Sequence, residues 1–274
     1  MQWQGRRGSS NVEDRRGMGG KTLIGGGIGG LIILLLSTLL GGNAGDLLNS
    51  LTGTGADSNS NSAYVETQDE KELTQFVSVV LADTEDVWTQ VFKEEGRVYE
   101  KPTLVLYTDS VQSACGTAGS SVGPFYCPGD RKLYIDLSFY DELKQKFGAP
   151  GDFAMAYVIA HEVGHHVQTL LGTMGDGSDR SNEHSVRIEL QADYLAGVWA
   201  HYEQDMNVLE QGDLEEALNA ASAVGDDTLQ KKAQGYVVPE SFTHGTSDQR
   251  KRWFYKGFQS GRIEGGDTFN TDEL

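Results

Sequence analysis

Three histidines stand within six positions of an otherwise apolar stretch, "AYVIAHEVGHHVQTLLG", residues 156–172. His161 and His165 are four residues apart, so on a helix both imidazoles project from one face. His166 lies about 100° further round, and we interpret it as a structural residue or a support behind the ligands. Glu162 follows His161 directly. His-Glu-x-x-His predicts two neutral nitrogen ligands for Zn²⁺ and a neighbouring carboxylate that acts as general base on a water.

A second stretch, "RIELQADYLAGVWAH", carries the carboxylates that would complete such a site. A catalytic zinc ion has three protein ligands and one open position. Glu189 and Asp193 are again four apart, on a segment that is otherwise rather apolar. We expect Glu189 to be the third ligand and Asp193 to accept the outer ring N–H of His161. The other candidates for the third ligand are Asp193 itself, His184 and His201. The sequence therefore predicts one zinc ion per chain.

These residues resemble the gluzincin metallopeptidases, in which His-Glu-x-x-His is followed downstream by Glu-x-x-x-Asp. More closely, the chain resembles the putative neutral zinc metallopeptidase family of bacterial single-pass membrane proteins. The matching blocks span nearly the whole chain: "WQGRRGSSNVEDRRG", "GPFYCPGDRKLYIDLSFYDEL", "AHEVGHHVQ", "ELQADYLAGVW" and "SFTHGTSDQRKRWFYKGF". The resemblance implies a zincin-like hydrolase fold with an active-site helix pair. The chain departs from it at Tyr194 and near "GGDTFN", where relatives often carry cysteines, so the family's disulfide count does not carry over.

The segment "SFTHGTSDQRKRWF" holds a further catalytic candidate. The resemblance to gluzincins implies a donor from the C-terminal part of the chain that steadies the oxyanion of the tetrahedral intermediate. His244 is a catalytic candidate for this role, and a tyrosine such as Tyr255 is an equally open one; the plainer interpretation of His244 is a hydrogen-bonded loop histidine. A Thr-Ser cap predicts a helix that begins at Asp248, with the basic run 250–252 in solvent.

The predicted activity is the hydrolysis of peptide bonds in a peptide or protein substrate. Zinc would polarise the scissile carbonyl and bring the pKa of its water to about 7. Glu162 would take the proton of that water and pass it to the leaving amine. A substrate strand could align with a sheet edge at "KLYIDL" or "GPFY". The alternatives are hydrolysis of another bond, or a membrane-tethered assembly or interaction protein with a structural zinc site, which would need four protein ligands and no general base.

The composition limits the partners of the chain. With 274 residues, 38% of them apolar, the chain is long enough for one good-sized globular domain. A net charge of −18 disfavours nucleic acid as a partner, because phosphate binding needs clustered lysine and arginine. Cys115 and Cys127 predict one disulfide if this part of the chain lies outside the cytosol, and two buried thiols if it lies inside. The sequence does not indicate an oligomeric state.

An apolar, uncharged stretch at 22–42 has the length of a transmembrane helix. A cleaved signal peptide is the alternative, although a clear cleavage site is lacking. Positive charges precede the stretch, so we expect residues 1–21 to be a cytoplasmic tail and the rest to be exported. Residues 43–63 are rich in Gly, Ser and Asn and predict a flexible linker. The predicted protein is thus a single-pass protein of a bacterial inner membrane, with an extracytoplasmic zinc metallopeptidase domain at 64–274.

The pattern of that domain predicts an α+β fold, with a small antiparallel sheet near the front and a mostly helical remainder. Residues 102–108 are typical of a strand and residues 123–137 of a β-hairpin. Before them, apolar residues at helical spacing form two stretches, with a break and cap expected at "ADTED", residues 82–86. A further helix is expected from Asp152 to Leu171, which carries the histidines.

Overall fold

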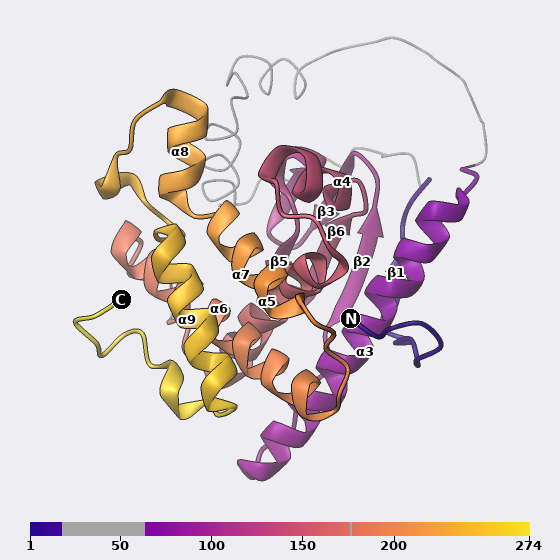
Figure 1. Ribbon diagram of the computed structural model, residues 1–274, viewed down its shortest axis with the longest axis horizontal. Helices are drawn as coiled ribbons and strands as arrows, with labels where there is room; N and C mark the ends of the chain where they lie inside the picture. Colours follow the sequence, from indigo (N-terminus) through magenta and orange to yellow (C-terminus); the bar gives the residue numbers. More distant parts are fainter. Residues whose placement is uncertain (18–63, 176) are drawn as a thin grey trace.

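The computed structural model describes residues 1–17, 64–175 and 177–274 (Figure 1). The fold is α+β as predicted, with a small sheet, a separate hairpin and a helical remainder. The predicted transmembrane helix at 22–42 and the linker at 43–63 lie outside the described residues. Across the residues that are described, no helix is long and apolar enough to cross a bilayer.

The main sheet has the strand order β1-β2-β6-β5 and is mixed. β1 (Val12–Asp14) pairs in parallel with β2 (Thr103–Tyr107), and β2 pairs in parallel with β6 (Lys132–Asp136). β5 (Phe125–Cys127) and β6 form the predicted antiparallel hairpin. The expected antiparallel sheet is therefore wrong for the other two pairs. Hairpins have a local turn signal, whereas a parallel pair joins segments far apart in the chain and leaves none.

A second, two-stranded antiparallel sheet consists of β3 (Ser110–Ser113) and β4 (Gly116–Gly119). Cys115 stands in the turn between these strands and is disulfide-bonded to Cys127 at the end of β5, with a Cα–Cα distance of 5.8 Å. The bond ties the small hairpin to the edge of the main sheet.

The first long helix, α3 (Gln68–Glu94), is continuous through the segment where we expected a break. Thr67 caps its start in a reciprocal capping box with Glu70. The predicted break at 82–86 is wrong because its polar side chains do not cap a helix end. Three of these residues, at positions 83–85, are buried in the fold and have partners there.

The centre of the molecule is α5 (Asp152–Leu171), which has the predicted bounds. It packs against α3 and β5, and also against α6 (Asn182–Asp205) and α7 (Asp213–Ala223) (Figure 1). A Cβ atom at Gly164 would lie 2.8 Å from the carbonyl oxygen of Ala192, so this glycine allows α5 and α6 to approach closely. The histidine-bearing face of α5 is thereby brought against α6.

The C-terminal part closes the other side of α6. α9 (Ser247–Ser260) packs along α6 and is capped by Thr246, close to the predicted start. A Cβ atom at Gly257 would collide with the carbonyl oxygen of Tyr194, so glycine is required for this contact too. The remaining helices are α4 (Phe139–Glu142) and α8 (Asp226–Gln234), with short 3₁₀ or π turns at Ser120–Val122, Leu143–Phe147, Pro239–Ser241 and Glu264–Gly266.

Residues 1–17, which we call the N-terminal arm, belong to the segment predicted as a cytoplasmic tail, residues 1–21, and they pack onto the body. The arm supplies β1 to the main sheet and runs beside α3 (Figure 1). The side chain of Met1 is buried, and the ring of Trp3 packs edge-on against that of Phe76 at 5.5 Å. The predicted domain at 64–274 therefore lacks one strand of its sheet, which the arm supplies.

Candidate metal centre

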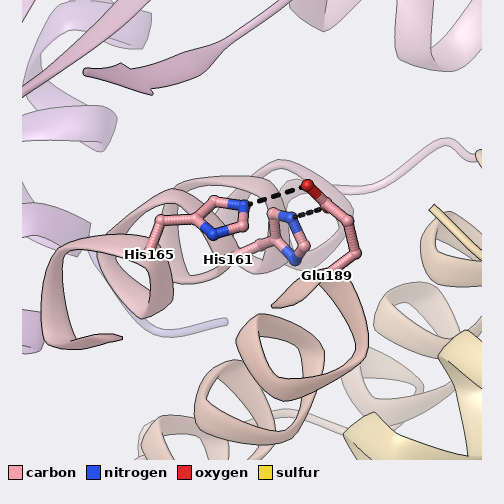
Figure 2. Close-up of side chains that lie close together, drawn as sticks. All are labelled: His161, His165 and Glu189. Atoms are coloured by element: carbon pink, nitrogen blue, oxygen red, sulfur yellow. Dashed lines mark hydrogen bonds and ion pairs between the residues drawn. The ribbon is translucent and has the colours of Figure 1, made fainter. Parts of the chain in front are cut away.

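Three side chains predicted as metal ligands meet between α5 and α6 (Figure 2). The Nε2 atom of His161 lies 3.1 Å from Oε2 of Glu189, and Nε2 of His165 lies 3.5 Å from Oε1 of the same carboxylate. Ligand atoms at the usual 2.0–2.2 Å from a tetrahedral zinc ion are about 3.4 Å apart. The donor atoms thus have the types and the spacing of a zinc site.

Helix geometry explains why these side chains converge. His161 and His165 are one turn apart on α5, and both are largely buried, at 6% and 9% exposure. Glu189 is on α6, which lies close because of the contact at Gly164. The predicted trio is therefore brought together by one helix crossing.

The outer nitrogen of His161 is held as predicted. Its Nδ1 lies 2.9 Å from Oδ1 of Asp193, which is fully buried. Asp193 also accepts hydrogen bonds from Nε of Arg250 (2.8 Å), from Nη2 of Arg250 (3.0 Å) and from the hydroxyl of Tyr157 (2.5 Å). Burial raises the pKa of Asp193, but Arg250 and His161 outweigh it and lower the pKa to about 2. The carboxylate is held in its ionised form and faces the outer nitrogen of His161, outside the cluster that the three candidate ligands form.

The position of Arg250 differs from the predicted one. We expected it in solvent with its neighbours, but it is only 4% exposed. It stands at the start of α9, and the close packing of α9 on α6 directs its guanidinium onto Asp193. Its basic neighbours at 251 and 252 remain at least partly exposed. The run of three basic residues gave no sign that one of them points inward.

The outer nitrogen of His165 has a different partner, which the sequence did not reveal. Its Nδ1 lies 2.8 Å from Oε1 of Gln168, and Nε2 of Gln168 donates to the carbonyl of Ile188 (2.8 Å) and to Oε1 of Gln191 (3.0 Å). The spacing of three residues on one helix is the signal that could have indicated this contact. Both histidines thus have their outer nitrogens held and their inner nitrogens directed at Glu189.

The charges of the trio are coupled. Burial lowers the pKa of His161, but Asp193 and Glu189 outweigh it and raise the pKa to about 10. Burial raises the pKa of Glu189, but the two histidines outweigh it and hold the pKa well below its usual range. A carboxylate that stays ionised beside two imidazoles provides the negative charge a divalent cation requires.

Glu162 lies in the same buried surroundings, at 8% exposure, and burial raises its pKa. Within the described chain its carboxylate has no hydrogen-bond partner, although His161, His165 and Glu189 all act on it electrostatically. A buried carboxylate without a donor is costly unless a ligand or water supplies one. Its surroundings suit a base that acts on a water beside the metal ligands.

His244 reaches the neighbourhood of the trio from the loop before α9. Its Nδ1 lies 3.2 Å from Oδ1 of Asp226, whose other oxygen accepts the backbone N–H groups of residues 243–245. Burial lowers the pKa of His244, but Asp226 and Glu189 outweigh it and raise the pKa. Asp226 was not predicted, because only the fold brings the start of α8 to this loop. The alternative donor, Tyr255, is 42% exposed and stacks on Phe258.

The other histidines lie outside the trio. His166 is fully buried between the hydroxyl of Tyr126 (3.1 Å) and the carbonyl of Glu100 (2.6 Å), which agrees with a structural role. The two alternative third ligands have other neighbours: His184 lies beside Asp179 and Phe269, and His201 beside Phe258 and Asp205.

Comparison of the chain with known protein families gives the same family as the sequence motifs. A family model described as "Putative neutral zinc metallopeptidase" matches residues 1–269. The chain belongs to this family. The predicted family is thus confirmed, and its description supports a zinc-dependent peptidase in general terms. The gluzincin type remains a prediction.

The chain is similar to proteins of Escherichia coli and of mycobacteria. "Uncharacterized protein YpfJ" of Escherichia coli K12 is 51% identical over 276 residues, covering 95% of this chain and 96% of the relative. "Uncharacterized protein Mb2605" of Mycobacterium bovis and "Uncharacterized protein Rv2575" of Mycobacterium tuberculosis H37Rv are each 43% identical over 190 residues, covering 64% of this chain and 65% of the relative. No solved structure matches the chain.

Proposed function

We propose that the protein is a zinc metalloendopeptidase of the gluzincin type, with His161, His165 and Glu189 as the ligands of one zinc ion. The observation that carries the proposal is Glu162, a buried carboxylate without a hydrogen-bond partner in the described chain, beside donors at zinc spacing. A structural zinc site has four protein ligands. The cluster of His161, His165 and Glu189 has three, so a fourth position on the metal would be left for water or substrate.

The residues divide the chemistry among them. Zinc, when bound, polarises the scissile carbonyl and lowers the pKa of the attacking water. Glu162 accepts a proton from that water and transfers it to the nitrogen of the leaving amine as the C–N bond breaks. His244 donates a hydrogen bond to the oxyanion through Nε2 in its protonated form, in which Nδ1 also donates to Asp226 and which the raised pKa of the ring favours.

The substrate is a peptide strand that adds to the sheet at β5. β5 is the last strand in the order β1-β2-β6-β5, whereas β6 has neighbours on both sides. Of the two predicted edges, "GPFY" therefore fits and "KLYIDL" does not. Tyr126 of β5 hydrogen-bonds to His166 of α5, so this edge lies beside the helix of the metal ligands. Main-chain pairing at an edge binds extended peptides with little dependence on sequence.

We infer that the body works outside the cytosol, at a bacterial inner membrane. The disulfide between Cys115 and Cys127 supports an oxidising compartment. The apolar stretch at 22–42 supports attachment to the membrane.

The test compares the wild-type full chain with Glu162→Gln, and with Glu183→Gln as a control at an exposed carboxylate of α6. Zinc content and cleavage of an unfolded protein are measured on each. We expect one zinc ion in all three, and cleavage that falls by about 10²–10⁴-fold in Glu162→Gln alone. Zinc in all three without cleavage by any would favour a zinc-binding assembly protein. Equal cleavage by Glu162→Gln would contradict the assigned base.

A further inference from the structure

We infer that the N-terminal arm and the body, residues 64–274, lie in the same aqueous compartment, on the same side of the membrane. This topology differs from the one predicted from the sequence, in which residues 1–21 are cytoplasmic and the body is exported. It does not depend on the proposed peptidase activity.

The backbone of the arm is part of the sheet. The three residues of β1 are in parallel register with β2, with Val12 opposite Leu104. Hydrogen bonds continue the pairing on both sides: the N–H of Leu104 donates to the carbonyl of Asn11 (2.9 Å), and the N–H of Arg15 donates to the carbonyl of Leu106 (2.8 Å). Removing the arm would leave these buried groups of β2 without partners, and such groups are costly to leave unpaired.

A buried pair of carboxylates requires the arm even more directly. Asp83 on α3 and Glu203 on α6 are 5% and 0% exposed. Nη1 of Arg6 lies 2.9 Å from Oδ2 of Asp83 and 3.4 Å from Oε2 of Glu203. In the part of the chain that the structure describes, the ion pairs of both carboxylates are with Arg6. A body folded without the arm would bury two neighbouring carboxylates with no cation, so that they would have to take up protons to remain buried.

A third buried carboxylate, Glu85, is also bonded to residues of the arm. It is 1% exposed, and its Oε1 accepts hydrogen bonds from Oγ of Ser9 (2.5 Å) and Nδ2 of Asn11 (2.7 Å). Lys101 of the body reaches the other oxygen at 3.0 Å. The polar residues that resemble a helix break in the sequence are thus the surface of α3 on which the arm docks.

Both ends of the undescribed stretch emerge at one place. Gly17, the last described residue of the arm, lies against Tyr64, where the body begins. Nη2 of Arg16 bonds to Glu66 at 2.7 Å, and its guanidinium lies 5.4 Å from the centre of the Tyr64 ring. The chain therefore departs from the body and returns to it at adjacent points.

The membrane topology follows from the length of the apolar stretch. One helical crossing takes about 20 apolar residues and a return crossing as many again. The stretch at 22–42 suffices for one crossing and is too short for two. One crossing would separate β1 from β2 and Arg6 from its two carboxylates. Attachment through this stretch is therefore to one face of the bilayer.

The first test places single cysteines in the full chain, Gln4→Cys in the exposed part of the arm and Val98→Cys at an 86% exposed position of the body. The native cysteines are disulfide-bonded. A membrane-impermeant maleimide is applied before and after rupture of the inner membrane, with labelling in denaturant as the reference. We expect both cysteines to react at the same stage. Reaction of one before rupture and of the other only after it would overturn the inference. Reaction of both only after rupture would support the shared compartment and contradict the exported body.

The second test forms a bond between the arm and the body. A Cβ atom at Gly8 would lie 3.5 Å from Cβ of Ser78, within the range for a disulfide. Gly8→Cys with Ser78→Cys should cross-link in native membranes under a permeant oxidant. After cleavage at a protease site introduced in 43–63, the arm should then stay attached to the body until reduced. The control pairs Gly8→Cys with Gln90→Cys, about 18 Å further along α3. No cross-link with either partner, while Gly8→Cys reacts freely with maleimide, would overturn the inference.

Discussion

Asp193 and Glu203 are both fully buried, both on α6 and both beside an arginine, yet their surroundings differ in kind. Asp193 accepts two hydrogen bonds from Arg250 and others from Tyr157 and His161, and its pKa is held at about 2. Among the described residues, Glu203 has one ion pair, with Arg6 at 3.4 Å, and a second carboxylate, Asp83, nearby. Burial raises its pKa to about 8.

The difference shows how one helix serves two purposes. All the donors to Asp193 come from helices of the body, so the ionised carboxylate behind the metal ligand is set by the fold itself. The cation beside Glu203 comes from the arm. The first region is therefore ordered by the body alone, whereas the second is complete only when the arm is in place.

The largest effect is expected from Asp193→Asn, which would leave Arg250 buried without its counter-charge. Breaking such a pair costs about 3–5 kcal/mol, and losing the support of a metal-bound histidine weakens metal binding by about 10–100-fold. Chemical unfolding and zinc titration measure the two effects. Asp205→Asn, at an exposed carboxylate on the same helix, is the control and should change neither. Wild-type values for Asp193→Asn would remove the distinction between the two regions.

A smaller loss is expected from Arg6→Ala, because the two carboxylates it leaves can take up protons. We expect the free energy of unfolding to fall by about 1–3 kcal/mol. The neighbouring Arg7→Ala removes an ion pair with Asp86 that is more than half exposed on both sides, and should cost at most about 1 kcal/mol. Equal losses in the two variants of the full chain would show that the arm does not depend on the buried pair.

A third expected effect is a dependence of stability on pH. Burial raises the pKa of Asp83 to about 7 and that of Glu203 to about 8, so above their ordinary pKa values the folded chain binds more protons than the unfolded chain. Stability should therefore fall as pH rises from 5 to 6.5, by up to about 1.4 kcal/mol per pH unit for each group. Glu203→Gln should reduce this slope in denaturant titrations. A slope that stays the same in Glu203→Gln would contradict the assignment.

Helical periodicity was enough to predict that His161, His165 and Glu189 lie close together. His161, His165 and Glu189 lie on two helices whose faces follow from spacing alone, and Asp193 follows from the same spacing. Gln168 is the exception, a partner on the same helix that was overlooked.

Contacts between distant segments were not predictable in this way. Arg250 and Asp226 reach the site through the packing of α9 and α8, for which the sequence has no periodic signal. The arm was missed for a similar reason. The residues at 83–85 are polar in the middle of a helix, which is typical of a helix break. The sequence does not indicate that the arm supplies partners for Asp83 and Glu85.

The most direct test of the metal centre is zinc binding by the wild-type full chain and by Glu189→Gln, with Glu183→Gln as the matched control on α6. Equilibrium titration against a chelator of known affinity gives both the stoichiometry and the dissociation constant. The structure predicts one zinc ion per chain in the wild type and in Glu183→Gln, and weakened binding in Glu189→Gln, which loses the ligand carboxylate. Wild-type affinity in Glu189→Gln, or no zinc in the wild type, would contradict the assignment of the site.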